Sequence, residues 1–125
     1  VYKRQAYCCI ASNAKDFARF GKLYKDHGKW NGNQILDSAF VEKSITPRFP
    51  SSPQYGYGWW LKEHIGKQFF MMRGHLGQYV IVQPEDNGII VWLGHSIGPG
   101  DAIATFTPDI MTYIEEAYNM LKDDY

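Results

Sequence analysis

Ser12 and Lys15 have the spacing of a nucleophile and its base. In a Ser-x-x-Lys pattern the amine lies one helical turn from the hydroxyl, where it can take the hydroxyl proton and activate the oxygen for attack on a carbonyl. The stretch Ser12-Asn13-Ala14-Lys15 satisfies this pattern. Ser12, however, directly precedes an amphipathic segment, and a serine that caps a helix has its oxygen occupied by backbone amides. We therefore reject Ser12 as a nucleophile.

The remaining reactive residue types do not form a metal or redox motif. Cys8 and Cys9 are adjacent, and a disulfide between neighbours would close a strained ring. No second cysteine pair and no histidine cluster has the spacing of zinc ligands. We expect the two cysteines to pack as small apolar side chains and the chain to use no metal or cofactor.

Composition narrows the classes of partner. The sequence has 125 residues, 45% of them hydrophobic, which suits one compact domain. Thirteen Lys and Arg balance thirteen Asp and Glu, so no broad positive field exists to hold nucleic acid or an anionic membrane. Apolar runs fall well short of the roughly 20 residues that a membrane-crossing helix needs. We expect neither a nucleic-acid partner nor a membrane span.

Three helices are predicted from periodicity and capping residues. Ser12 is the predicted N-cap of the first, and Gly28 suits the left-handed position that ends it. Asp37 can cap a shorter helix that stops before Pro47, because the residue before proline avoids helical geometry. Thr107, followed by proline, starts the last helix. The apolar stripes of the first and last helices are Phe17, Phe20, Leu23, Tyr24 and Ile110, Ile114, Ala117, Leu121.

Between the second and third helices the period changes to that of strands. Four strands are predicted at residues 57–61, 68–72, 78–83 and 89–93. The turn that joins the last two ends in Asn87-Gly88, which supplies the positive φ angles of a hairpin. The last two strands are nearly continuous in apolar residues, as in sheets covered on both faces. The predicted fold class is α+β, an antiparallel sheet of about four strands covered by helices.

Several stretches together resemble the C-terminal part of the serine β-lactamase and penicillin-binding-protein-like hydrolases. Residues 8–21 resemble the family's helix with the pattern Asp-Leu-Ala-Arg-Phe-Gly, and Gly-Lys-Trp-Asn-Gly follows at 28–32. Residues 55–60, Tyr-Gly-Tyr-Gly-Trp-Trp, are similar to the strand that opens the family's sheet. Residues 73–85 are similar to the segment that bears the Lys-Thr-Gly element. The resemblance implies a partial transpeptidase-like fold, an acyl-enzyme mechanism and a periplasmic or exported location.

The resemblance implies site residues in this third stretch. His75 stands at the position of the Lys in Lys-Thr-Gly, Leu76 at that of the Thr, and Gly77 on the Gly. His75 could donate a hydrogen bond or carry charge near the nucleophile; a histidine satisfied within the sheet is the alternative. Gly77 lets the acyl group approach the strand, and the main-chain amide of Gln78 completes an oxyanion hole.

The substrate-binding residues implied in the same way are Leu76, Arg73 and Tyr79. Leu76 lacks the hydroxyl that would bind a substrate carboxylate, which favours an esterase, amidase or peptidase over a β-lactamase. Arg73 could replace part of this anion binding, although an exposed strand-end arginine is the simpler interpretation.

The resemblance also implies a domain organisation. Residues 1–5 resemble the translated end of a sequencing transposon and are interpreted as a cloning scar, with a natural basic N-terminus as the alternative. Residues 6–125 are then expected to be the C-terminal sheet-and-helix portion of a β-lactamase-like hydrolase domain. The nucleophilic Ser, its Lys and a Tyr-x-Asn element are then expected upstream, so this portion alone should be inactive. Its partners would be a small-molecule or peptide substrate and the N-terminal part of its own domain.

Two other functions stay open. The same fold could serve as a non-catalytic binding or sensor domain. Alternatively, a platform of aromatic side chains could bind sugars in a carbohydrate-binding module. Strand alternation sends Tyr57 and Trp59 to one face and Trp60 to the other, which favours a role in the core for most of these rings.

Overall fold

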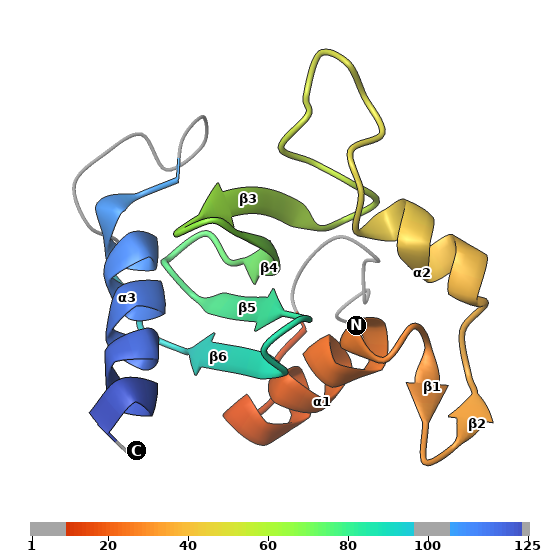
Figure 1. Cartoon of the computed structure of the whole chain (residues 1–125), viewed down its shortest axis with the longest axis horizontal. Helices are drawn as coiled ribbons and strands as arrows, with labels where there is room; N and C mark the ends of the chain where they lie inside the picture. The colour runs from red at the N-terminus through yellow and green to blue at the C-terminus, as the bar shows by residue number, and fades with distance from the viewer. Residues whose placement is uncertain (1–9, 97–105, 124–125) are drawn as a thin grey trace, which may run out of the picture.

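A computed structural model of the chain describes residues 10–96 and 106–123. The expectations for residues 1–5, Cys8 and Cys9 lie outside this range. Three helices and a four-stranded sheet dominate the described part (Figure 1). The helices are α1 (Ala14–Lys25), α2 (Ser38–Ser44) and α3 (Pro108–Asp123). No helix within these residues is both long and apolar enough to cross a membrane.

The sheet is antiparallel throughout, with the order β3-β4-β5-β6. This arrangement confirms the predicted α+β class. Its strands are β3 (Trp60–His64), β4 (Lys67–Arg73), β5 (Tyr79–Gln83) and β6 (Gly88–Trp92).

The first strand begins at Trp60, so the predicted start at residue 57 is wrong. The chain turns just before it, because the Gly56 N–H donates to the Trp59 carbonyl at 2.8 Å and Gly58 has a φ of +81°. A Cβ at position 56 would lie 1.9 Å from the Ser44 carbonyl oxygen, so glycine is required where this turn meets the end of α2.

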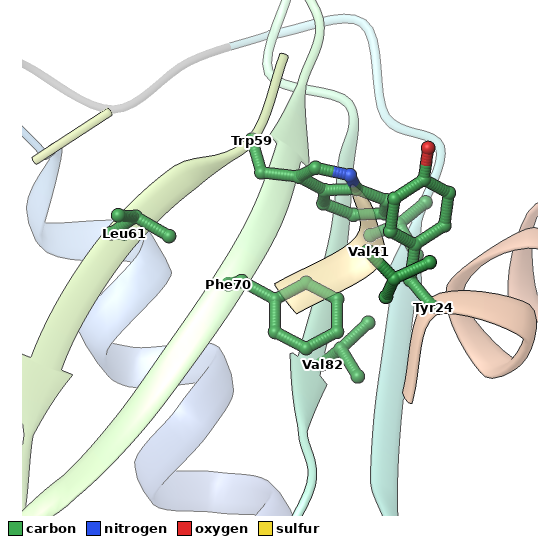
Figure 2. Close-up of a cluster of buried hydrophobic side chains, with 7 residues drawn as sticks. Tyr24, Val41, Trp59, Leu61, Phe70 and Val82 are labelled. Carbon is green, nitrogen blue, oxygen red and sulfur yellow. The ribbon is translucent and has the colours of Figure 1, made fainter. Parts of the chain in front are cut away.

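The two faces of the sheet carry separate hydrophobic clusters. Alternation along β5 directs Val80 and Val82 into the cluster on the α1 side, and Tyr79 and Ile81 into the cluster on the α3 side. Figure 2 shows the first cluster, where residues of α1, α2 and the loop before β3 meet the sheet. Each large side chain buried in this way contributes about 1.5–3 kcal/mol. The prediction that helices cover both faces is therefore confirmed for the described residues.

The N-cap of α1 is Asn13, so the prediction of Ser12 is wrong. The Asn13 side-chain oxygen accepts from the Asp16 N–H at 3.0 Å, while the Ser12 hydroxyl donates to the Asp16 carboxylate at 3.3 Å. The left-handed residue directly after the C-cap Asp26 is His27, with a φ of +52°, so the prediction that Gly28 takes this position is wrong. Gly28 follows with a φ of +82°, and its N–H donates to the Leu23 carbonyl at 2.8 Å.

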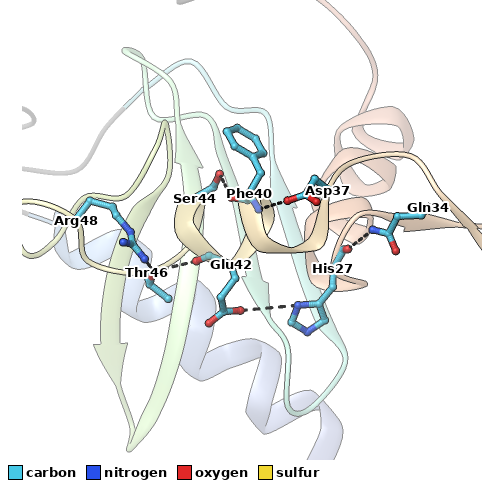
Figure 3. Close-up of polar contacts among 8 residues, drawn as sticks. All are labelled: His27, Gln34, Asp37, Phe40, Glu42, Ser44, Thr46 and Arg48. Carbon is cyan, nitrogen blue, oxygen red and sulfur yellow. Dashed lines mark hydrogen bonds and ion pairs between the residues drawn. The ribbon is translucent and has the colours of Figure 1, made fainter.

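A small hairpin, β1 (Lys29–Trp30) and β2 (Asn33–Gln34), joins α1 to α2. Its turn residues Asn31 and Gly32 both have positive φ, as a two-residue hairpin turn requires. Asp37 then caps α2 by accepting from the Phe40 N–H at 2.8 Å, as predicted (Figure 3).

The start of α3 is joined to the sheet by a side-chain hydrogen bond. The Thr107 hydroxyl lies 3.1 Å from the Tyr79 hydroxyl, and both side chains are buried. Ile110 and Ile114 are fully buried beneath the helix, whereas Leu121 is 54% exposed, so the predicted stripe reaches solvent near the C-terminal end.

Candidate active site

The turn between β4 and β5 contains the residues singled out by the sequence. Its ends are held together because the Gly74 N–H donates to the Gln78 carbonyl at 2.7 Å, and the Gly77 N–H donates to the Gly74 carbonyl at 3.2 Å. Gly77 has a φ of +81°, a conformation that costs other residues about 1–2 kcal/mol. His75, Leu76 and Gly77 therefore lie in a turn, directly before β5.

Gln78 has a structural role that the sequence analysis did not consider. Its side-chain oxygen accepts from the Leu76 N–H at 3.2 Å, and its side-chain nitrogen donates to the Gly94 carbonyl at 2.6 Å. The side chain thus fixes the turn and ties it to the segment after β6. The main-chain N–H of Gln78 makes no hydrogen bond to any other described residue, as a donor reserved for a bound oxyanion would require.

His75 and Leu76 occupy the solvent-exposed part of the turn. Leu76 is 49% exposed, and the His75 imidazole is exposed and forms no hydrogen bond or ion pair within residues 10–96 and 106–123. This placement does not fit the alternative of a histidine satisfied within the sheet. The imidazole can instead present either ring nitrogen to a bound molecule.

The side chains of Arg73 and Tyr79 lie elsewhere, in the layer between the sheet and α3. The Arg73 guanidinium is 4.7 Å from the centre of the Trp60 ring and 5.1 Å from that of Phe106, within the range of cation–π contacts. Tyr79 is 2% exposed and is bonded to Thr107. The structure thus brings His75, Leu76, Gly77 and Gln78 together in one turn. Arg73 and Tyr79 are close to this turn only through their main chains, because their side chains pack elsewhere.

The aromatic residues before and in β3 are divided between core and surface. Trp59 is 3% exposed and packs edge-on against Phe70, with ring centres 4.9 Å apart. Trp60 is on the opposite face, under Arg73, so the predicted alternation of the two tryptophans is confirmed. Tyr57 remains 45% exposed beside Phe40, so the expectation of a core role does not hold for this ring.

The architecture defines the class to which this structure is similar. An α+β chain with a four-stranded antiparallel sheet and three helices is consistent with a partial transpeptidase-like fold, as found in hydrolases of the β-lactamase and penicillin-binding-protein superfamily.

Among solved structures, the chain is similar to a putative 6-aminohexanoate-dimer hydrolase from Bacillus anthracis, with a TM-score of 0.59 and 25% sequence identity. The similarity covers 86% of this chain and 28% of that hydrolase chain, so this chain spans less than a third of the hydrolase. No family model and no curated protein sequence matches the chain.

Proposed function

We propose that this chain forms one wall of the active site of a serine hydrolase that acts on an ester, amide or peptide bond through an acyl-enzyme. The observation that carries the proposal is the turn of residues 75–78, in which His75 and Leu76 are exposed and the Gln78 main-chain N–H has no partner among the described residues. The similarity to a hydrolase supports the same class of chemistry.

The nucleophile and its base come from protein segments other than those described. Ser12 does not supply the hydroxyl, because it is exposed at the start of α1 and bonded to Asp16. In the proposed reaction a serine oxygen attacks the substrate carbonyl carbon while a lysine amine takes the hydroxyl proton. The leaving group departs with a proton, and water then attacks the acyl ester, which releases the acid and restores the serine.

In these steps the turn contributes hydrogen-bond donors. The Gln78 N–H donates to the carbonyl oxygen as negative charge develops on it, and the loss of one such donor typically lowers kcat by 100-fold to 1000-fold. His75 donates a hydrogen bond close to the nucleophile or the leaving group. Gly77 adopts the left-handed conformation that the turn requires, and this conformation orients the Gln78 N–H and the His75 imidazole.

Substrate preference follows from Leu76. An exposed leucine side chain offers no hydrogen bond to a carboxylate, and the Arg73 guanidinium packs on the rings of Trp60 and Phe106. The proposed substrates therefore carry a neutral or apolar group at this position, which favours esters and amides over penicillin-type carboxylates.

The test compares two histidine variants of the protein in which this chain is joined to its Ser-x-x-Lys segment. His75→Asn should lower kcat for nitrophenyl ester and amide hydrolysis at least about tenfold. His27→Asn is the matched control, because His27 is also exposed but lies in the turn after α1. Equal activity of the two variants would refute the proposed role of the turn.

A non-catalytic binding domain of the same fold is the alternative class. If this alternative holds, the protein contains no Ser-x-x-Lys pattern other than the one at residues 12–15, and it hydrolyses neither the ester nor the amide in this assay. A carbohydrate module is not favoured, because Trp59 is buried and Trp60 is covered by Arg73.

A further inference from the structure

The turn of residues 75–78 has a neighbouring turn at the same end of the sheet. β3 and β4 are adjacent and antiparallel, and the first residue of β3, Trp60, pairs with Met71 near the end of β4. The segment just before β3 and the turn just after β4 therefore leave the sheet at the same end. Residues 56–59 form the first of these two turns.

Three aromatic side chains meet at the turn of residues 56–59 and remain exposed to solvent. Phe40 comes from α2 (Figure 3), Phe49 from the loop that follows it, and Tyr57 from the turn itself, and each is between 45% and 47% exposed. The Tyr57 ring centre lies 6.4 Å from that of Phe40 and 6.3 Å from that of Phe49. The three rings therefore form one apolar surface, which we call the aromatic cluster.

The position of Tyr57 in the aromatic cluster is fixed by its backbone. The Tyr57 N–H donates to the Ser44 carbonyl at 2.9 Å, which fastens the turn to the last residue of α2. Gly56 permits this approach, because a Cβ there would lie 1.9 Å from the same carbonyl oxygen. A surface that is already positioned in this way loses little conformational entropy when a ligand binds.

The turn of residues 75–78 is tied to its neighbour on one side only. On the β6 side, the Gln78 side chain bridges from this turn to the Gly94 carbonyl at 2.6 Å. On the β3 side, no hydrogen bond among the residues that the structure describes joins this turn to residues 56–59. A substrate group that extends from the Gln78 N–H towards β3 therefore meets no such bridge.

The spacing of the strands determines how long this group must be. Gln78 directly precedes β5, and residues 56–59 directly precede β3, which is two strands away in the sheet. Neighbouring strands are about 4.8 Å apart, so the two places are separated by about 10 Å across the sheet. A chain of about three carbons between a carbonyl carbon and a ring spans most of this distance, and it brings the ring to the aromatic cluster.

The chemistry of the aromatic cluster favours an apolar ligand group, and an aromatic one in particular. Its rings carry one polar atom, the Tyr57 hydroxyl oxygen, so they offer little hydrogen bonding to a sugar or a carboxylate. Aromatic rings pack on one another by burying apolar area and by edge-to-face or offset stacking. The exposed Leu76 side chain adds a further apolar group from the turn of residues 75–78.

We propose that the aromatic cluster of Phe40, Phe49 and Tyr57 binds an aromatic ring at the end of the substrate's acyl chain. The acyl carbonyl oxygen accepts a hydrogen bond from the Gln78 N–H while the ring packs on Tyr57. This inference rests on the proposed hydrolysis and specifies its substrate class. The substrates are esters and amides of arylalkanoic acids with about three carbons between the carbonyl group and the ring.

The first experiment compares the nitrophenyl esters of butyric acid and of γ-phenylbutyric acid as substrates of the proposed serine hydrolase. The two esters share the leaving group and the reacting carbonyl and differ only in the ring. kcat/KM should be about tenfold higher for the γ-phenylbutyrate ester. Tyr57→Ala and Phe49→Ala should each lower this ratio about fivefold, because each removes a ring that the substrate ring contacts.

Trp92→Ala is the matched control. Trp92 is 44% exposed and lies at the same end of the sheet, since it pairs with Tyr79, but its ring stacks on Tyr113 of α3 with ring centres 4.9 Å apart. This variant should keep the preference for the γ-phenylbutyrate ester. A ratio that falls in Trp92→Ala and stays constant in Tyr57→Ala and Phe49→Ala would overturn the proposal, as would equal hydrolysis of the two esters by the wild type.

A binding measurement separates failure of this inference from failure of the proposed hydrolysis. The isotope-labelled chain is titrated with γ-phenylbutyramide and, as the control without a ring, with butyramide. Only γ-phenylbutyramide should shift the amide resonances of Phe40 and Tyr57, and Tyr57→Ala should weaken its binding about fivefold. If these shifts occur in a protein that hydrolyses neither ester, the ring site stands and the proposed hydrolysis is wrong. An absence of the shifts in the wild type would overturn the ring site, whatever the activity.

Discussion

Replacing Gly77 by alanine should reduce both stability and activity, by two separable mechanisms. Gly77 has a φ of +81°, and an alanine in this left-handed conformation costs about 1–2 kcal/mol. For a chain of this size the melting temperature should fall by roughly 3–6 °C per kcal/mol. Relief of the strain would also move the adjacent Gln78 N–H, and a displacement of about 1 Å at a reacting centre can lower the rate about 100-fold.

Gly66→Ala is the matched control for this prediction. Gly66 has a φ of +71° in the β3–β4 turn, and a Cβ there would meet no atom within 4 Å. Urea denaturation should show a similar loss of free energy of unfolding for both variants. In the proposed serine hydrolase, ester hydrolysis should fall only for Gly77→Ala. If the two variants hydrolyse the ester equally well, the turn does not orient a catalytic donor.

Three further predictions concern stability. Asn13→Ala should lower the free energy of unfolding by about 1 kcal/mol through loss of the α1 cap, whereas Ser12→Ala should change it by less than about 0.5 kcal/mol; comparable losses would show that the cap has been misassigned. Trp59→Ala should cost about 3–5 kcal/mol, and a loss below about 1 kcal/mol in urea titration would contradict its burial. Hydrogen bonds from Lys67 and then Tyr118 hold the pKa of Asp86 below its ordinary value of 3.8, so this carboxylate stabilises the fold above about pH 4, and that stability is lost as the pH falls through the lowered pKa. Asp86→Asn should flatten this part of the acid-denaturation profile, and an unchanged profile would refute the coupling.

Local sequence signals predicted the elements whose cause is local. The hairpin between β5 and β6 at Asn87-Gly88 and the cap at Asp37 depend on residues within a few positions of one another, and alternation separated Trp59 from Trp60. The first strand was placed too early because the turn at Gly56 depends on the Ser44 carbonyl, which lies twelve positions away.

The candidate site was predicted only in part, for the same reason. The resemblance located the turn, but the tie from the Gln78 side chain to Gly94 spans sixteen positions and has no sequence pattern. Alternation could have indicated that Tyr79 and Gln83 lie on the same face of β5.

The burial of all five residues of β5 has a consequence for how this protein can change by mutation. Substitutions within the strand disturb one of two packed layers and should be poorly tolerated. The turns at its two ends contain exposed positions, such as His75 and Leu76 in the turn proposed to meet a substrate, that can vary at little cost to folding. Libraries that randomise exposed positions of these turns and leave the strand intact should therefore yield a high fraction of folded variants with altered ligand preference.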